Sequence, residues 1–101
     1  MSSNKRRPAI IISNDEYNRR TQDAIVVGVT SNIQRKEYSV PLGKEDMDEG
    51  ELLRESEIRA DKIYAVNQGI VVKRFGRIKE DIFREVIKKI SVLIEARAAG
   101  R

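Results

Sequence analysis

Short apolar runs separated by polar breaks fill most of the chain. Residues 8–13 contain three consecutive isoleucines, and residues 23–30 read Asp-Ala-Ile-Val-Val-Gly-Val-Thr. Runs rich in β-branched residues are typical of strands whose two faces are both covered. We therefore predict strands over residues 8–13 and 23–30, with the polar segment 14–18 as a turn between them.

Weaker patterns predict further strands after residue 36. A shorter strand is expected over residues 37–42, and the acidic stretch 44–50 is expected to be a loop. Residues 51–56 and 57–66 predict either two strands or one bent strand. Residues 67–69 fit a hairpin turn because glycine accepts positive φ, and residues 70–75 are expected to form the next strand.

The C-terminal segment has the periodicity of an amphipathic helix, which we predict over residues 79–98. Glu80 and Asp81 complement the dipole in its first turn, whereas Ile78 and Lys79 are poor N-cap residues. The apolar residues recur at spacings of one, three and four: Ile82, Phe83, Val86, Ile87, Ile90, Leu93 and Ile94.

Five or six short strands followed by one helix predict a mainly β fold with a C-terminal helix, in the α+β class. Small sheets of this kind close into a barrel or pack a helix over an open end. The length of 101 residues suits one domain, and no repeat or linker divides the chain. Residues 1–101 are therefore predicted to form a single domain.

The composition excludes several kinds of site. The chain has no cysteine and no histidine, so disulfides, thiolate metal sites and every Ser-His or Cys-His nucleophile arrangement are excluded. Catalysis would have to use Arg, Lys, Asp, Glu, Ser, Thr or Tyr, although a carboxylate Mg²⁺ site stays possible in principle. No run approaches the roughly 20 apolar residues of a membrane span, so we expect a cytoplasmic protein.

The charge is high and unevenly distributed. Charged residues make up 36% of the chain, against roughly 25% in average proteins. This excess fits an ion-paired, thermophile-like surface or a binder of polyanions. Residues 44–57 hold seven acidic and two basic residues, which is a net charge of −5. Because the whole chain has a net charge of +4, the rest of the chain carries +9. A basic body with one acidic segment favours a polyanionic partner.

Four segments resemble, in order, the sequence signatures of the MazF/PemK toxin family. Residues 5–15 (KRRPAIIISND) are similar to the signature K-x-R-P-x, followed by three hydrophobic residues and then S-N-D. Residues 27–31 (VGVTS) are similar to a strand ending in P-hydrophobic-T-S, with glycine in place of proline. Residues 57–63 (EIRADKI) are similar to Q-I-R-T-hydrophobic-D-K, and residues 75–78 (FGRI) to G-x-L before the closing helix.

The opening strand of that family, G-D followed by alternating hydrophobic residues, has no counterpart in the chain. Residues 1–7 correspond to a remnant of the loop after it. A different start of the coding region, a shortened chain and a strand supplied from elsewhere all stay open. An edge left exposed by the loss would favour pairing with another chain.

The resemblance implies a small SH3-like, CcdB-type barrel that acts as the toxin of a type II toxin–antitoxin system. Such toxins are sequence-specific endoribonucleases that cleave single-stranded RNA without metal or cofactor. The 2′-OH of RNA attacks the neighbouring phosphate, so DNA is not a substrate. The resemblance also implies a homodimer and a cognate antitoxin with an acidic, flexible tail.

The same resemblance assigns the candidate site residues. Arg7 is the expected catalytic cation, which stays protonated and can donate two hydrogen bonds to a phosphate. Thr30 is its expected hydroxyl partner. Candidate RNA contacts are Ser31, Arg59, Arg19, Arg20, Arg35 and Lys36. For most of these bases a surface role is the ordinary alternative, and Arg59 could instead pair with Asp61 or Glu57.

Two other classes of function fit parts of the sequence. A catalytically impaired homologue, or a CcdB-like binding module, would engage an antitoxin or other partner without cutting RNA. A small basic barrel that only binds RNA would fit the charge but not the motifs. Mapping the 5′ ends produced from a defined single-stranded RNA separates the nuclease from both.

Overall fold

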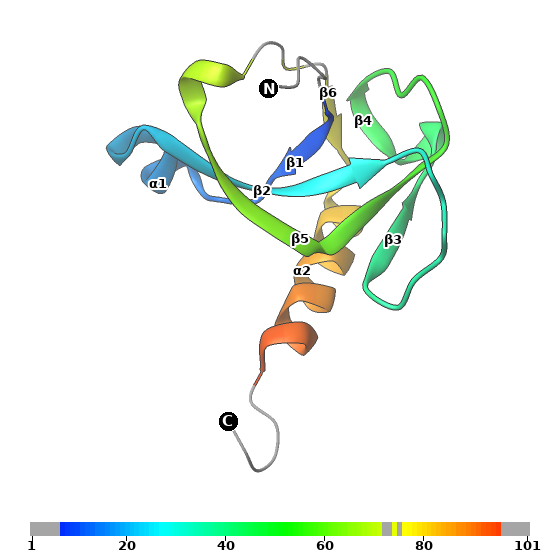
Figure 1. The fold of residues 1–101 in the computed structure, drawn as a ribbon. Helices are drawn as coiled ribbons and strands as arrows, with labels where there is room; N and C mark the ends of the chain where they lie inside the picture. Colours follow the sequence, from blue (N-terminus) through cyan, green and yellow to red (C-terminus); the bar gives the residue numbers. More distant parts are fainter. Residues whose placement is uncertain (1–6, 72–73, 75, 96–101) are drawn as a thin grey trace, which may run out of the picture.

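A four-stranded antiparallel sheet in the order β1-β2-β5-β3 forms the body of the molecule (Figure 1). The computed structural model of the chain describes residues 7–71, 74 and 76–95. Neighbouring strands of the sheet are antiparallel throughout. The strands are β1 (Ala9–Ile11), β2 (Asp23–Thr30), β3 (Ser39–Leu42) and β5 (Ser56–Asn67).

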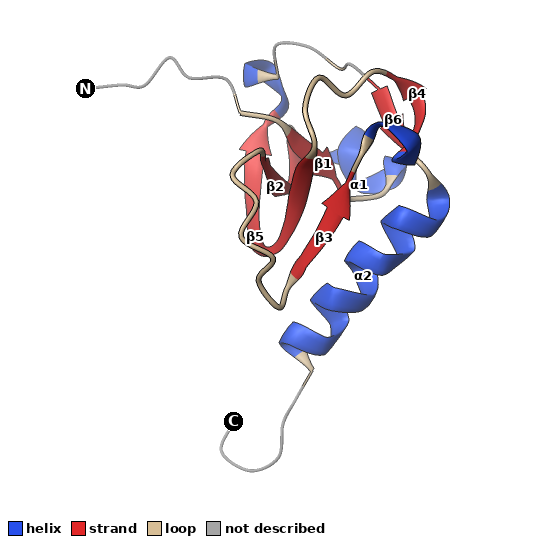
Figure 2. Ribbon diagram, turned by 90° about the vertical axis from the view of Figure 1, so that its right-hand side faces the viewer, coloured by secondary structure: helices blue, strands red, loops and turns tan. Residues whose placement is uncertain are grey.

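A two-stranded sheet and a long helix complete the fold. Strand β4 (Met47–Gly50) pairs with β6 (Gly76–Ile78), and helix α2 (Glu80–Ile94) then packs along β3 and β5 (Figure 2). The N–H of Lys79 donates to the carbonyl of Asp46 at 2.9 Å, which fixes the start of α2 against the 3₁₀ turn η1 (Lys44–Asp46). This half-barrel of strands with a long C-terminal helix confirms the predicted fold class.

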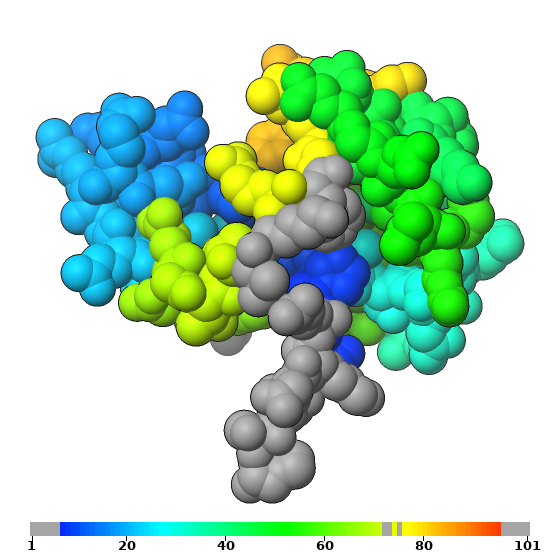
Figure 3. All heavy atoms as spheres, turned by 90° about the horizontal axis from the view of Figure 1, so that it is seen from above, coloured from blue at the N-terminus to red at the C-terminus, as the bar shows by residue number. Residues whose placement is uncertain are grey.

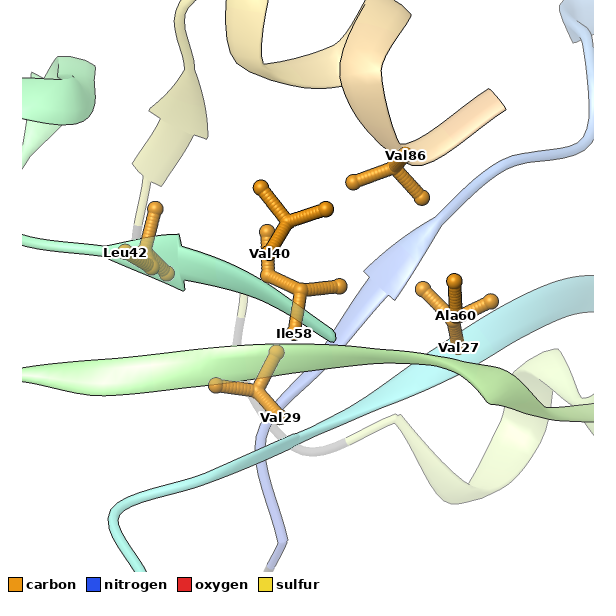
Figure 4. Close-up of a cluster of buried hydrophobic side chains, with 7 residues drawn as sticks. All are labelled: Val27, Val29, Val40, Leu42, Ile58, Ala60 and Val86. Carbon is orange, nitrogen blue, oxygen red and sulfur yellow. The ribbon is translucent and has the colours of Figure 1, made fainter. Parts of the chain in front are cut away.

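The core lies between α2 and the inner face of the four-stranded sheet (Figure 4). Alternate residues of β2, β3 and β5 point inward, as the two-residue period of a strand requires. From the helix, Val86 points toward them, with Ile82 and Ile90 partly buried one turn to either side. The seven buried side chains of this cluster are Val27, Val29, Val40, Leu42, Ile58, Ala60 and Val86.

Helix α2 differs from its prediction in burial. It ends at Ile94, with Glu95 as the C-cap in an extended conformation, and residues 96–98 of the predicted helix lie outside the described residues. Lys79 is the N-cap and makes no side-chain capping bond, as its residue type predicted. Ile87 and Leu93 carry the apolar pattern but are exposed, because the sheet covers only the stripe centred on Val86.

Strand β5 is sharply bent, as Figure 1 shows. Val27 pairs with Ile63, but the next residue, Gly28, pairs with Arg59, so residues 60–62 have no partner on β2. Extra residues on one strand bend it and increase its twist. Of the two possibilities that the sequence left open over residues 51–66, one bent strand is therefore correct, and it starts only at Ser56.

The predicted turn at residues 14–18 is wrong, because a short helix, α1 (Asp15–Arg20), begins there. Asn14 is its N-cap, and its side-chain oxygen accepts a hydrogen bond from the N–H of Tyr17 at 2.8 Å. Acidic residues occupy the first turn and basic residues the last, which complements the helix dipole. The same Asx residue can start a turn or a helix, and here Asn14 caps a helix.

Two more local predictions need correction. The acidic stretch 44–50 is not a plain loop, because it forms η1 and then β4, which finds its partner β6 far along the chain. Asn67 caps a 3₁₀ turn, η2 (Gln68–Ile70), instead of a hairpin turn. Ile70 therefore belongs to η2 and not to the strand predicted over 70–75, of which residues 72, 73 and 75 lie outside the described residues.

Replacing Ile58 by alanine tests whether this cluster holds the fold together. Ile58 is 0% exposed near the start of β5, so we expect Ile58→Ala to lower the free energy of unfolding by about 2–5 kcal/mol. Urea denaturation followed by circular dichroism measures the change. The control is Leu53→Ala at a side chain that is 87% exposed, where a change within about 0.5 kcal/mol is expected. Equal effects of the two substitutions would contradict the proposed core.

Candidate active site

Polar side chains gather on the face of the sheet that points away from α2. Thr30 follows the buried Val29 on β2, and Glu57 precedes the buried Ile58 on β5. The side chains of Thr30 and Glu57 therefore point to the opposite face. Thr30 pairs with Glu57, and Glu57 pairs with Pro41, which sets the three in one row across β2, β5 and β3. Residues directly opposite in an antiparallel pair share a face, so their side chains are neighbours.

Arg7 extends this row on the side of β1. Ala9 pairs with Gly28, and the N–H of Val29 donates to the carbonyl of Pro8 at 3.2 Å. Continuing the antiparallel register by one residue sets Arg7 opposite Thr30. Arg7 is exposed, and the Thr30 hydroxyl accepts a hydrogen bond from the N–H of Asn32 at 3.0 Å. The two residues predicted to be catalytic thus lie at the same end of adjacent strands.

Glu57 is buried on this polar face, where its carboxylate holds the loop between β2 and β3. Its side-chain oxygens accept hydrogen bonds from the backbone N–H groups of Gln34 and Arg35, each at 3.1 Å. Arg35 has a φ of 55°, which is uncommon for a residue with a side chain. Glu57 was not among the predicted site residues. The sequence signal that could have identified it is an acidic residue in a predicted strand, directly before the apolar Ile58.

The loop over residues 31–38 is fastened at its far end as well. The carbonyl of Tyr38 accepts from the N–H of Ala60 at 2.9 Å, and the carbonyl of Glu37 accepts from the Lys89 ammonium at 2.9 Å. These bonds tie the loop to β5 and to α2. The loop carries Ser31, Arg35 and Lys36, three predicted RNA contacts, and their side chains are exposed beside the Thr30 row.

Arg59 is engaged with Asp61 in a paired, two-bond contact. Its Nε and Nη2 donate to the two carboxylate oxygens at 3.0 Å each. The hydrogen bonds that Arg59 donates to the Asp61 carboxylate raise the pKa of Arg59 and hold the pKa of Asp61 below its usual value, although partial burial opposes both shifts. Of the two roles predicted for Arg59, the structure shows the ion pair, so an RNA phosphate would have to compete with Asp61.

Arg19 and Arg20 lie away from this group. Both belong to α1, before the first residue of β2, whereas Thr30 is its last residue, roughly 23 Å along the strand. In Figure 3, α1 and the acidic segment after β3 lie at opposite ends of the visible face. Arg20 pairs with Glu16 at 3.3 Å, and Arg19 borders a separate depression of about 720 Å³. Arg19 and Arg20 therefore lie at the opposite end of β2 from Thr30, and their predicted contact with RNA stays a prediction.

Other features of the described part bear on the remaining predictions. No group of three acidic side chains within residues 7–71, 74 and 76–95 is arranged to hold a metal ion. Over the same residues, no helix is both long and apolar enough to pass through a membrane. The ion pair Arg84–Glu80, like Arg20–Glu16, is exposed. The thermophile-like surface stays a prediction.

Comparison with known proteins gives one family and one fold. The family model described as PemK-like, MazF-like toxin of type II toxin–antitoxin systems matches residues 2–94. No curated protein sequence matches. Among solved structures, MazE-MazF from Deinococcus radiodurans superposes with a TM-score of 0.75 at 23% identity, over 88% of this chain and 82% of that one.

Two mycobacterial structures show the same fold. An endoribonuclease from Mycobacterial species has a TM-score of 0.73 at 20% identity, over 85% of this chain and 77% of that one. An endoribonuclease in complex with its cognate antitoxin has a TM-score of 0.74 at 18% identity, over 90% and 84% of the two chains. At such identities the likeness concerns the fold.

Removing the Glu57 carboxylate should release the loop between β2 and β3. Glu57→Ala leaves two backbone N–H groups without their acceptor, so we expect faster hydrogen exchange at Gln34 and Arg35 and a loss of about 1–3 kcal/mol of stability. Amide exchange measured by NMR detects the release. The matched control is Glu51→Ala, at an exposed acid of the neighbouring segment. Unchanged exchange at both amides would contradict the anchoring role.

The Arg59–Asp61 pair should give stability a defined pH dependence. Because the folded pKa of Asp61 is lowered, its contribution is complete above the unfolded pKa of about 4 and is lost as the pH falls through the folded value. We expect the difference in urea midpoint between wild type and Asp61→Asn to be constant near neutrality and to shrink below about pH 4. Asp48→Asn, at an exposed acid, should show no such change. A difference that grows in acid would contradict the assignment.

Proposed function

The chain belongs to the PemK-like, MazF-like toxins of type II toxin–antitoxin systems, and from this premise we propose that it is a metal-independent endoribonuclease that cleaves single-stranded RNA at specific sequences. Solved structures of the same fold include proteins described as endoribonucleases. The proposal extends that description to this chain, and it locates the chemistry at the shared end of β1 and β2.

The observation that carries the proposal is the register between Arg7 and Thr30. Pro8 pairs with Val29 through the hydrogen bond to the Pro8 carbonyl, so Arg7 falls opposite Thr30 without any change in the sheet. A cationic fork and a hydroxyl at one strand end can both reach a single phosphate group. The absence of histidine and cysteine from the sequence leaves such groups to support RNA cleavage.

The reaction proceeds within the RNA itself. The ribose 2′-oxygen attacks the adjacent phosphorus and the bond to the 5′-oxygen breaks, which leaves a 2′,3′-cyclic phosphate and a 5′-hydroxyl end. One proton leaves the 2′-OH and one is delivered to the departing 5′-oxygen. Arg7 stays protonated and stabilises the negative charge that develops on the non-bridging oxygens. Thr30 donates a further hydrogen bond to the same phosphate.

Residues around this pair hold and steer the RNA. Ser31, Arg35 and Lys36 are exposed on the loop that Glu57 anchors, which suits contacts with phosphates on one side of the cleaved bond. Glu57 anchors this loop, because both oxygens of its carboxylate already accept hydrogen bonds from backbone N–H groups. Arg59 joins the RNA contacts only when it leaves Asp61.

We also propose a homodimer and a cognate antitoxin with an acidic, flexible tail. Toxin chains of this fold have been crystallised as MazE-MazF and with a cognate antitoxin. Outside residues 44–57 the chain carries +9, so an acidic tail would be attracted to the surface that receives RNA. The antitoxin tail and RNA would then compete for the same surface. This competition would take place in the cytoplasm, where messenger RNA is present.

Arg7→Ala tests the proposed catalytic cation. Removing one preorganised donor of the transition-state charge should lower the cleavage rate by about two orders of magnitude. The measurement is single-turnover cleavage of a defined single-stranded RNA, with the 5′ ends mapped and EDTA present throughout. Because Arg7 is exposed, the circular dichroism spectrum and the urea midpoint should stay unchanged.

Two controls make the result specific. Arg84→Ala removes an exposed arginine of α2 and should leave the rate within twofold of wild type. An RNA with a single 2′-deoxy nucleotide at the cleaved position should not be cut. Activity of Arg7→Ala within twofold of wild type would disprove its role, and loss of cleavage in EDTA would disprove metal independence. A folded wild-type chain that binds an antitoxin but cuts no RNA would favour the binding-module alternative.

A further inference from the structure

An open depression of about 410 Å³ lies on the polar face of the sheet, beside the Thr30 row. Ile33, Arg35 and Lys36 of the loop between β2 and β3 line one side of it. Figure 2 shows the path of this loop beside β5. Its volume is in the range of small-molecule sites. The lining includes Ile33 and Pro41 as apolar groups, Ser39 and Glu55 as hydrogen-bonding groups, and Arg35 and Lys36 as cations.

The depression begins one strand away from the proposed catalytic pair. Glu57, which also lines it, pairs with Thr30 on one side and with Pro41 on the other. Neighbouring strands are about 4.8 Å apart, so a phosphate at Thr30 and a group in the depression are separated by roughly one or two strand spacings. That separation suits a phosphate and the base of an adjacent nucleotide.

The shape and the charges favour a nucleobase over a simple anion. The Ile33 side chain is 42% exposed and can cover one flat face of a base, with Pro41 contributing further apolar surface. Arg35 and Lys36 are exposed on the loop and can contact the attached phosphates. A free anion would meet the carboxylates of Glu55 and Glu57, which would repel it.

Two of the oxygen-bearing side chains in the lining, Ser39 and Glu55, have no partner within the described residues. The Ser39 hydroxyl is a buried side-chain oxygen that makes no hydrogen bond within the described residues. The exposed Glu55 carboxylate makes neither a hydrogen bond nor an ion pair within that same part of the chain. Buried polar groups are rarely left unsatisfied in native proteins, so a ligand that completes the Ser39 hydroxyl is a physical explanation. Glu55 is exposed and is available to the same ligand as an acceptor.

An ionised carboxylate can only accept hydrogen bonds. Adenine, cytosine and guanine each carry an exocyclic amino group that donates, and a glutamate can accept from such a group. Uracil instead presents carbonyl oxygens on both sides of a single N–H. A carboxylate that accepts from this N–H has a carbonyl oxygen close to its own oxygens on either side, and the repulsion between these oxygens disfavours uracil.

We propose that this depression binds a base next to the cleaved phosphate and selects bases with an exocyclic amino group against uracil, with Glu55 as the selecting residue. The location next to a cleaved phosphate rests on the proposed nuclease function. The preference itself rests on the acceptors of the depression. It makes Glu55 a determinant of the RNA sequence that is cut.

Titration with single nucleotides tests the preference without any cleavage. Purified wild-type protein is titrated with the 3′-monophosphates of adenosine, cytidine, guanosine and uridine, and amide shifts are followed by NMR. We expect shifts at Ile33 and Ser39, with the uridine nucleotide binding about tenfold more weakly than the best of the others. Equal binding of all four nucleotides, or shifts confined to other parts of the chain, would overturn the proposal.

Glu55→Gln tests the selecting residue. The glutamine amide can donate to a uracil carbonyl, so the variant should bind the uridine nucleotide within about twofold of the others. The matched control, Glu51→Gln, changes an acid that does not line the depression and should keep the wild-type preference. An unchanged preference in Glu55→Gln would show that Glu55 does not select the base.

Mapping of RNA cleavage sites separates this inference from the nuclease proposal. Selective nucleotide binding without RNA cleavage would disprove the nuclease and leave the base preference standing. Cleavage at sites that contain uracil as often as the other bases at both neighbouring positions would support the nuclease and disprove the preference. In Glu55→Gln, we expect cleavage to spread to sites with uracil at one of these positions.

Discussion

The packing of strand β5 under helix α2 is the constraint on which the rest of the structure depends. Ile58 and Ala60 are completely buried there, and Val86 of α2 closes the same cluster from the other side. Because side chains alternate along a strand, burying these two residues fixes the direction of Glu57 and Arg59. A slip of one residue would bury the charges and expose the core, so the register of the site is set by hydrophobic burial.

The polar face gains its organisation from that register. Glu57 is held in the central strand, and its carboxylate accepts from two backbone amides of the loop between β2 and β3. The loop therefore keeps one position although its own residues are exposed. On the other side of Thr30, the pairing of β1 brings Arg7 to the same row. A cation, a hydroxyl and an anchored basic loop thus meet on one face without histidine, cysteine or an internal metal site in the described part.

The balance of charges around this face has consequences for binding. Arg59 donates hydrogen bonds from both Nε and Nη2 to Asp61, whereas Arg35 and Lys36 are exposed at the edge of the depression. Arg35 and Lys36 therefore add positive charge on the loop that can contact phosphate, beside that of Arg7. Glu55, which has no partner within the described residues, adds an acceptor beside those cations, and this suits a ligand with both a phosphate and a donor-bearing base.

The sequence by itself determined the hydrophobic pattern, and with it the strand Asp23–Thr30, the C-terminal helix and the mainly β class. Its motifs also pointed to Arg7 and Thr30, because motif residues are read locally. Only the tertiary structure decided what depends on distant partners: that 47–50 becomes a strand by pairing with Gly76–Ile78, that Arg19 lies far from Thr30, and that Glu57 anchors a loop. Pairing and burial join residues far apart in the chain, so no local pattern contains them.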